Sequence, residues 1–202
     1  MKSINSLGKI ILASKSPRRE EILSKINLNF DIVPSNIDEK LDIKLDPATY
    51  VQNCAEKKAY KVSLSYKENF VIGADTIVVF DNQILGKPKD ELESYSMLKM
   101  LSGQKHTVFT GVSIQNYDKK TCQSFYCLTT VELNRLSDEL ISFYIEKHKP
   151  FDKAGSYGIQ DWFSCQVKSI NGCYYNVMGL PLSELFKRLL ILANKMDFKI
   201  IK

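Results

Sequence analysis

The alternation of apolar and polar positions predicts short strands and helices that follow one another along the chain. Apolar runs bounded by polar turns are typical of buried strands, and they occur at 9–13, 29–33, 70–80, 105–115 and 121–132. Ser-Pro and Asp-Pro pairs favour helix starts, because proline fits the first helical position. Helices are predicted from Pro17, from Pro47 to about Tyr66, near 90–101 and 137–148, and after Pro181.

Three glycine- and asparagine-containing segments predict turns. Gly73-Ala74-Asp75 predicts a break inside the apolar run 70–80, and Asp81-Asn82 predicts a hairpin into QILG. Asn171-Gly172, between CQVKSI and CYYNV, predicts a second hairpin. Helix–strand units favour parallel neighbours whereas hairpins force antiparallel ones, so the order predicts an α/β fold with a mixed sheet. We expect residues 1–202 to form a single unit, with two lobes around a cleft.

Composition narrows the class of protein. The chain has 202 residues, 44% of them hydrophobic and 25% charged, and 28 basic against 23 acidic residues give a net charge of +5. This positive surplus suits an anionic ligand but is too small to indicate a polynucleotide partner. The sequence also lacks the aromatic residues interleaved with arginine that are typical of an RNA-binding surface.

The five cysteines are odd in number and form no C-x-x-C pair, which favours reduced thiols. With neither an apolar leader nor a stretch of about 18 apolar residues, we expect a cytoplasmic protein.

A possible anion site lies at the helix start LASKSPRR (12–19). Unpaired N–H groups at a helix N-terminus attract anions, and the guanidinium groups of Arg18 and Arg19 match phosphate oxygens. Ser14 and Ser16 add hydroxyl groups. Two arginines oppose the helix dipole there unless an anion lies between them. Solvent-facing arginines at an ordinary Ser-Pro start are the competing interpretation.

Asp75 is the candidate catalytic group, because a lone carboxylate inside an apolar strand is costly unless it is paired or binds a metal. Small residues before it favour a close approach by a ligand. A general base or metal ligand is one interpretation, and an aspartate in a tight turn is the other. Only two histidines occur, which excludes a His-rich zinc site, so any metal would be a carboxylate-bound ion such as Mg²⁺ or Mn²⁺.

Other polar positions are weaker signals by themselves. Lys87 stands between Gly86 and Pro88, Lys58 lies within a predicted helix, and Gln160 ends the loop FDKAGSYGIQ. The common nucleotide-binding motifs, G-x-x-x-x-G-K-[ST] and G-x-G-x-x-G, do not occur in the sequence.

Five segments together resemble the successive signature blocks of the Maf family of nucleotide pyrophosphatases. They cover about residues 10–190 in the family's order: LASKSPRREEIL, GADTIVVFDNQILGKP, LSGQKHTVFTGVSI, DKAGSYGIQ and NGCYYNVMGLPL. The resemblance implies an ITPase-like elongated mixed sheet flanked by helices. It also implies metal-assisted hydrolysis of a nucleoside triphosphate to the monophosphate and pyrophosphate, and a homodimer.

The resemblance assigns roles to single residues. Arg18, Thr76 and Gln160 resemble the branch of the family that acts on dTTP and UTP. Asp75 matches the proton acceptor or metal ligand, and Glu39 matches an acidic position near the metal. The positions that line the triphosphate in the family match Ser14, Arg19, Lys58 and Lys87.

Two alternatives stay open at this point. One is the same reaction on 7-methyl-GTP or another modified nucleotide. The other is a non-catalytic nucleotide sensor that regulates cell division; such a sensor keeps the phosphate cradle but has no need of Asp75.

Overall fold

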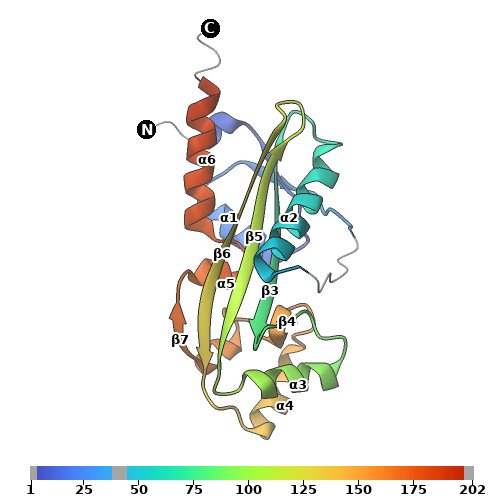
Figure 1. Cartoon of the computed structure of the whole chain (residues 1–202), viewed down its shortest axis with the longest axis vertical. Helices are drawn as coiled ribbons and strands as arrows, with labels where there is room; N and C mark the ends of the chain where they lie inside the picture. The colour runs from blue at the N-terminus through green and yellow to red at the C-terminus, as the bar shows by residue number, and fades with distance from the viewer. Residues whose placement is uncertain (1–3, 38–44, 198–202) are drawn as a thin grey trace.

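A computed structural model describes residues 4–37 and 45–197 (Figure 1). Within them, the strands form one sheet with the order β2-β1-β3-β5-β6-β7, and β4 pairs with β3. The strands are β1 (Ile10–Leu12), β2 (Phe30–Ile32), β3 (Phe70–Phe80), β4 (Gln83–Leu85), β5 (Lys105–Asn116), β6 (Thr121–Leu133) and β7 (Val167–Asn171). The α-helices are α1 (Pro17–Ser24), α2 (Pro47–Ser63), α3 (Glu91–Leu101), α4 (Asp138–His148), α5 (Tyr174–Met178) and α6 (Leu182–Asp197). Short 3₁₀ helices are η1 (Ile4–Leu7), η2 (Ala154–Ser156) and η3 (Trp162–Gln166).

The sheet is mixed, as the sequence predicted. β1 is parallel to β2 and β3, whereas the pairs β3–β4, β3–β5, β5–β6 and β6–β7 are antiparallel. The long strands β3, β5 and β6 run along the length of an elongated molecule (Figure 1). Helix α6 packs on η1 beside one half of the sheet, and α3 and α4 pack together at the other end. The predicted α/β fold class is therefore confirmed.

Helix α2 lies unusually close to the sheet because two glycines face it. A Cβ atom at Gly73 in β3 would lie 2.3 Å from the carbonyl oxygen of Ala55. A Cβ atom at Gly111 in β5 would lie 2.3 Å from the carbonyl oxygen of Val51. Any side chain at either position would push the helix outward. Gly73 thus admits the backbone of α2, and the expectation that small residues before Asp75 admit a ligand is wrong for this position.

The predicted break in the run 70–80 is also wrong. β3 is continuous and pairs with β5 from Val71 to Val79, with Asp75 opposite Gly111. The carboxylate is tolerated inside a strand because a lysine on α2 neutralises it, as described below.

All five cysteines are free thiols.

One of the two predicted hairpins is confirmed. Asp81 and Asn82 adopt left-handed backbone angles, φ 46° and 59°, and connect β3 to β4. After Gly172, however, the chain forms α5 where the second strand of a hairpin was predicted. Buried Asn176 in this helix donates from Nδ2 to the carbonyl oxygen of Val108 and to Oγ1 of Thr129. These two contacts fix the segment as a helix against the sheet, and its local sequence does not reveal them.

His106 on β5 should make stability depend on pH. Its Nε2 lies 2.6 Å from the hydroxyl oxygen of Tyr157, and burial lowers the pKa of His106 to about 4. The unfolded chain binds this proton at an ordinary pKa of about 6.5. The free energy of unfolding should therefore fall as the pH drops from about 6.5 to about 4, by about 3 kcal/mol from this residue.

Urea unfolding at several pH values in this window measures the effect. In His106→Gln the slope of stability against pH should be shallower than in the natural chain, because the titrating group is gone. Equal slopes in the two proteins would contradict the assignment.

Candidate active site

A gap along one edge of β3 locates the candidate site. On this edge β1 pairs only with Phe70 to Ile72, and β4 pairs only with Val78 to Phe80. The stretch 73–77 between them pairs with β5 on the opposite edge but with no strand on this one, within the residues that the structure describes. Asp75 lies in the middle of the gap. Because the sheet is open here, side chains from both of its faces reach one space.

That space is a cavity of about 410 Å³. It brings together residues from the start of α1, from α2 and β3, from the loop around η2 and from the end of α5. Every predicted site residue within the described ranges lines it: Ser14, Arg18, Arg19, Lys58, Asp75, Thr76, Lys87 and Gln160. Glu39, the predicted acidic metal position, lies outside the described residues.

A buried ion pair joins α2 to β3 at the floor of the gap. Lys58 Nζ lies 2.6 Å from Oδ1 of Asp75, and the two side chains are only 7% and 8% exposed. Nζ also lies 3.4 Å from the carbonyl oxygen of Ala74. Removing either charge alone would leave its partner buried without compensation, which is strongly destabilising. The pair therefore holds a carboxylate and an ammonium side by side at the cavity wall.

Arg19 connects three separate parts of the chain. Its Nε donates to the carbonyl oxygen of Gly179 at 2.8 Å, Nη2 donates to Oγ1 of Thr76 at 3.0 Å, and Nη1 donates to Oγ of Ser14 at 3.4 Å. The guanidinium is thereby held in one plane before any ligand arrives. A pre-oriented cation of this kind loses little conformational entropy when it binds a phosphate.

The hydroxyl group of Thr76 has a defined polarity. Thr110 donates its hydroxyl hydrogen to the carbonyl oxygen of Asn176, 2.9 Å away. In the 3.0 Å contact between the two threonine hydroxyls, Thr76 must then be the donor. Since its one hydrogen is used and it also accepts from Arg19, Thr76 can offer a ligand only an acceptor.

The start of α1 provides part of the predicted cradle. Ser16 is the N-cap residue, but its side chain makes no capping hydrogen bond; its own N–H donates to Oγ of Ser14 at 3.1 Å. The first-turn N–H groups of α1 have no partners within the helix. These groups, with Ser14 and Arg19 beside them, face the same cavity.

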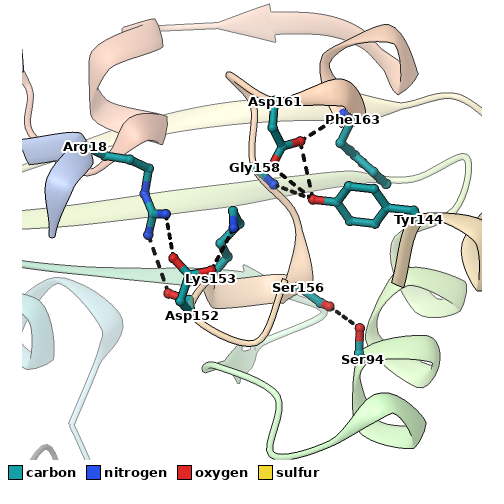
Figure 2. A network of polar contacts seen from close by, with 9 residues as sticks. All are labelled: Arg18, Ser94, Tyr144, Asp152, Lys153, Ser156, Gly158, Asp161 and Phe163. Atoms are coloured by element: carbon teal, nitrogen blue, oxygen red, sulfur yellow. Dashed lines mark hydrogen bonds and ion pairs between the residues drawn. The ribbon is translucent and has the colours of Figure 1, made fainter. Parts of the chain in front are cut away.

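The loop 149–161 closes the other side of the cavity and is tied down at several points (Figure 2). Ser156 hydrogen-bonds Ser94 of α3, and the N–H of Gly155 donates to the carbonyl oxygen of Gly86 at 3.0 Å. Further along, the hydroxyl group of Tyr144 accepts from the N–H of Gly158 and donates to Asp161, each at 3.2 Å. These anchors set the position of Gln160 at the cavity.

The cavity is strongly cationic. Of the described residues that line it, six are basic and two acidic, a surplus of four positive charges. The basic residues are Lys15, Arg18, Arg19, Lys58, Lys87 and Lys153, and the acidic ones are Asp75 and Asp152. A concave surface with this charge favours an anion that carries several negative charges.

A model of a protein family, described as Maf-like protein, matches residues 9–191. The chain belongs to the Maf family. The dTTP/UTP pyrophosphatase of Carboxydothermus hydrogenoformans is 45% identical over 90% of this chain and 97% of its own. That of Thermosipho africanus is 49% identical over 88% of this chain and 90% of its own. Among solved structures, the match to the Ham1 protein of Staphylococcus aureus covers 62% of this chain and 71% of that protein, at 12% identity and a TM-score of 0.41.

In this member of the Maf family, the described residues offer a divalent metal only a partial site. No group of three or more His, Cys, Asp or Glu side chains capable of holding an ion occurs within 4–37 and 45–197. Mg²⁺, however, is commonly bound by one or two carboxylates together with substrate phosphates and water. Asp75 fits this arrangement, because it lies at the cavity wall among cations that would hold the phosphates.

No helix in the described part of the chain has the length and apolarity to cross a bilayer.

Sequence reasoning missed several polar residues of this Maf site. Asp152 and Lys153 line the cavity, and Tyr144 and Asp161 hold its loop. The charged pair at the start of DKAGSYGIQ was the available signal, since charges beside a glycine-rich loop often mark a binding segment. Tyr144 carried no signal, because its position is that of an ordinary buried helix residue.

Removing the hydroxyl group of Tyr144 should destabilise the fold. Tyr144→Phe keeps the fully buried ring but leaves the N–H of Gly158 without its acceptor. An unsatisfied buried donor costs about 1–3 kcal/mol, and we expect a loss of that size in urea unfolding. Tyr126→Phe, at an exposed tyrosine on β6, is the matched control and should change stability by less than about 0.5 kcal/mol. Equal effects of the two substitutions would refute the role of this hydroxyl.

Proposed function

We propose that this chain hydrolyses dTTP and UTP to the nucleoside monophosphate and pyrophosphate. The observation that carries the proposal is a buried carboxylate, Asp75, at the wall of a cavity with six basic residues. Relatives of 45–49% identity, matched over most of both chains, are dTTP/UTP pyrophosphatases, and their names supply the substrate class.

The cationic residues have a clear task in this reaction. Water attacks the α-phosphorus, the bond to the bridging oxygen breaks, and pyrophosphate leaves with the electron pair. Arg19, Lys58 and Lys87 stabilise the negative charge that develops on the leaving group. Because Arg19 is already fixed by Gly179, Thr76 and Ser14, it needs no reorganisation as the charge develops.

Asp75 is the proposed proton acceptor for the attacking water. Lys58 holds its carboxylate in place from α2, so that one oxygen faces the ammonium and the group is fixed relative to the cavity. General bases held in this way contribute about 10²–10⁴-fold to rate. In this scheme Lys58 orients the base and also faces the phosphates.

We propose Mg²⁺ or Mn²⁺ as the cofactor. Asp75 and Glu39, the acidic position that the family resemblance assigns to the metal, would hold it together with phosphate oxygens of the substrate. Such an ion supplies charge neutralisation at the phosphates and lowers the pKa of bound water. The resemblance also predicts a homodimer. The sequence by itself predicts a single domain over residues 1–202 and a cytoplasmic location, and all three stay predictions.

Base recognition is proposed for Arg18 and Gln160, with Thr76 nearby. A uracil or thymine edge presents two carbonyl acceptors around one N–H donor. A guanidinium and a carboxamide complement that pattern, whereas a glutamate in place of Gln160 would repel the carbonyls and suit a cationic methylguanine. Thr76 acts as an acceptor or through Arg19, since its hydrogen is used by Thr110.

Incubation with Mg²⁺ or Mn²⁺ and a panel of dTTP, UTP, CTP, GTP and 7-methyl-GTP, followed by separation of the products, tests the function. We expect monophosphate and pyrophosphate, chiefly from dTTP and UTP. Preferential turnover of 7-methyl-GTP would keep the reaction and refute the base assignment. Tight binding without turnover of any member would favour a nucleotide sensor instead.

Asp75→Asn should separate binding from catalysis. The amide keeps an oxygen that can accept from Lys58 but cannot take a proton from water. We expect kcat for UTP to fall at least about 100-fold, with nucleotide binding retained. A thermal melt of the variant is required, because Lys58 loses its counter-charge. A folded variant with full activity would remove Asp75 from the mechanism.

A further inference from the structure

Asp152 links the two sides of the cavity through Arg18 (Figure 2). Arg18 Nη1 lies 2.7 Å from Oδ2 of Asp152, and Nη2 lies 3.4 Å from the carbonyl oxygen of the same residue. The two residues are 134 positions apart in the sequence, on α1 and on the loop before η2. Two separate contacts to one residue fix both the position and the plane of the guanidinium.

The other oxygen of Asp152 is held as well. Lys153 Nζ lies 2.7 Å from Oδ1, so each carboxylate oxygen has its own cation. The side chains of Arg18 and Lys153 are mostly covered, at 21% and 16% exposed, whereas that of Asp152 is 57% exposed. Partial burial raises the pKa of Asp152, but hydrogen bonds from Lys153 and Arg18 outweigh it, and the net pKa lies below its ordinary value. The carboxylate therefore remains ionised and keeps its hold on Arg18.

This geometry leaves part of the guanidinium available for a ligand. Arginine carries five N–H donors, and Asp152 takes one from each of the two terminal nitrogens. The remaining donors share a plane whose orientation Asp152 sets. An ion pair of which one member is more than half exposed contributes little to stability, so this pair matters through the geometry that it imposes on Arg18.

We propose that Asp152 is a positioning residue for base selection: it holds Arg18 so that the remaining guanidinium donors meet a carbonyl oxygen of a uracil or thymine base. This role rests on the proposed function and deepens it. The family resemblance assigns base recognition to Arg18 but no role to Asp152. Uracil presents a carbonyl acceptor where cytosine presents an amino donor. A donor that is fixed in place rejects cytosine, whereas one that swings freely can avoid the amino group.

Substitution of Asp152 tests this by the preference for UTP over CTP. In Asp152→Ala the ratio of the two kcat/KM values should fall by about 10- to 100-fold, the loss expected when a recognition group is misplaced. The change should come mainly from KM for UTP, with kcat little changed, because the triphosphate contacts remain. Asp152→Glu, which retains a carboxylate, should recover part of the preference.

A double-substitution cycle shows whether Asp152 acts through Arg18. Arg18→Ala should lose the preference by itself, and adding Asp152→Ala should then cause no further loss. Asp31→Ala is the matched control, since Asp31 on β2 forms a 2.6 Å ion pair with Lys9 away from the cavity-lining residues. It removes an equivalent exposed charge and should leave the preference unchanged. Thermal melts verify that each variant is folded.

Dissociation constants for UTP and CTP analogues with a non-hydrolysable α,β bridge give the same ratio without turnover. A natural chain that does not distinguish the two bases in binding or in turnover overturns the proposed base recognition and this inference with it. If the natural chain prefers UTP and folded Asp152→Ala keeps that preference, only the role of Asp152 is overturned. Tighter binding of both nucleotides by one common factor would likewise overturn it, because Asp152 would then merely oppose anions.

Discussion

The close approach of α2 to the sheet is the constraint on which the candidate site depends. Gly73 and Gly111 leave no room for a Cβ atom beneath the helix backbone, and this lets Lys58 reach Asp75 at 2.6 Å. At a more usual helix–sheet distance the carboxylate would be buried inside a strand without a counter-charge, which is costly. The packing of two glycines thus permits a charged group within the apolar core strand of the sheet.

The second determinant is the shortness of the strands that flank β3. β1 pairs with β3 only as far as Ile72, and β4 pairs with β3 only from Val78 onward. The edge of β3 around Asp75 is therefore open. Alternate residues of a strand point to opposite faces, yet Asp75 and Thr76 both line one cavity because it extends around this open edge. The ion pair with Lys58 is on one face, and the contact of Thr76 with Arg19 is on the other.

The sequence predicted the mixed sheet, the helix starts at Pro17 and Pro47 and eight of the residues that line the cavity, because those signals are local and occur in recognisable segments. It did not predict contacts between distant segments, such as Arg18 with Asp152 or Arg19 with Gly179. The helix α5 was mistaken for a strand because the buried amide of Asn176, which fixes it, has partners on β5 and β6. Gly73 was read as space for a ligand because the sequence gives no sign of which neighbour fills that space.

The bond from Arg19 to Gly179 joins residues 160 positions apart, so the site needs both the start of α1 and the residue that follows α5. During synthesis, β1 and α1 leave the ribosome long before β3 and α5 exist to complete the cavity. Contacts of such long range form late, because they require closure of a large loop. The nascent polypeptide consequently has no complete cavity until Gly179 has been synthesised, and a bound ligand stabilises only the folded molecule.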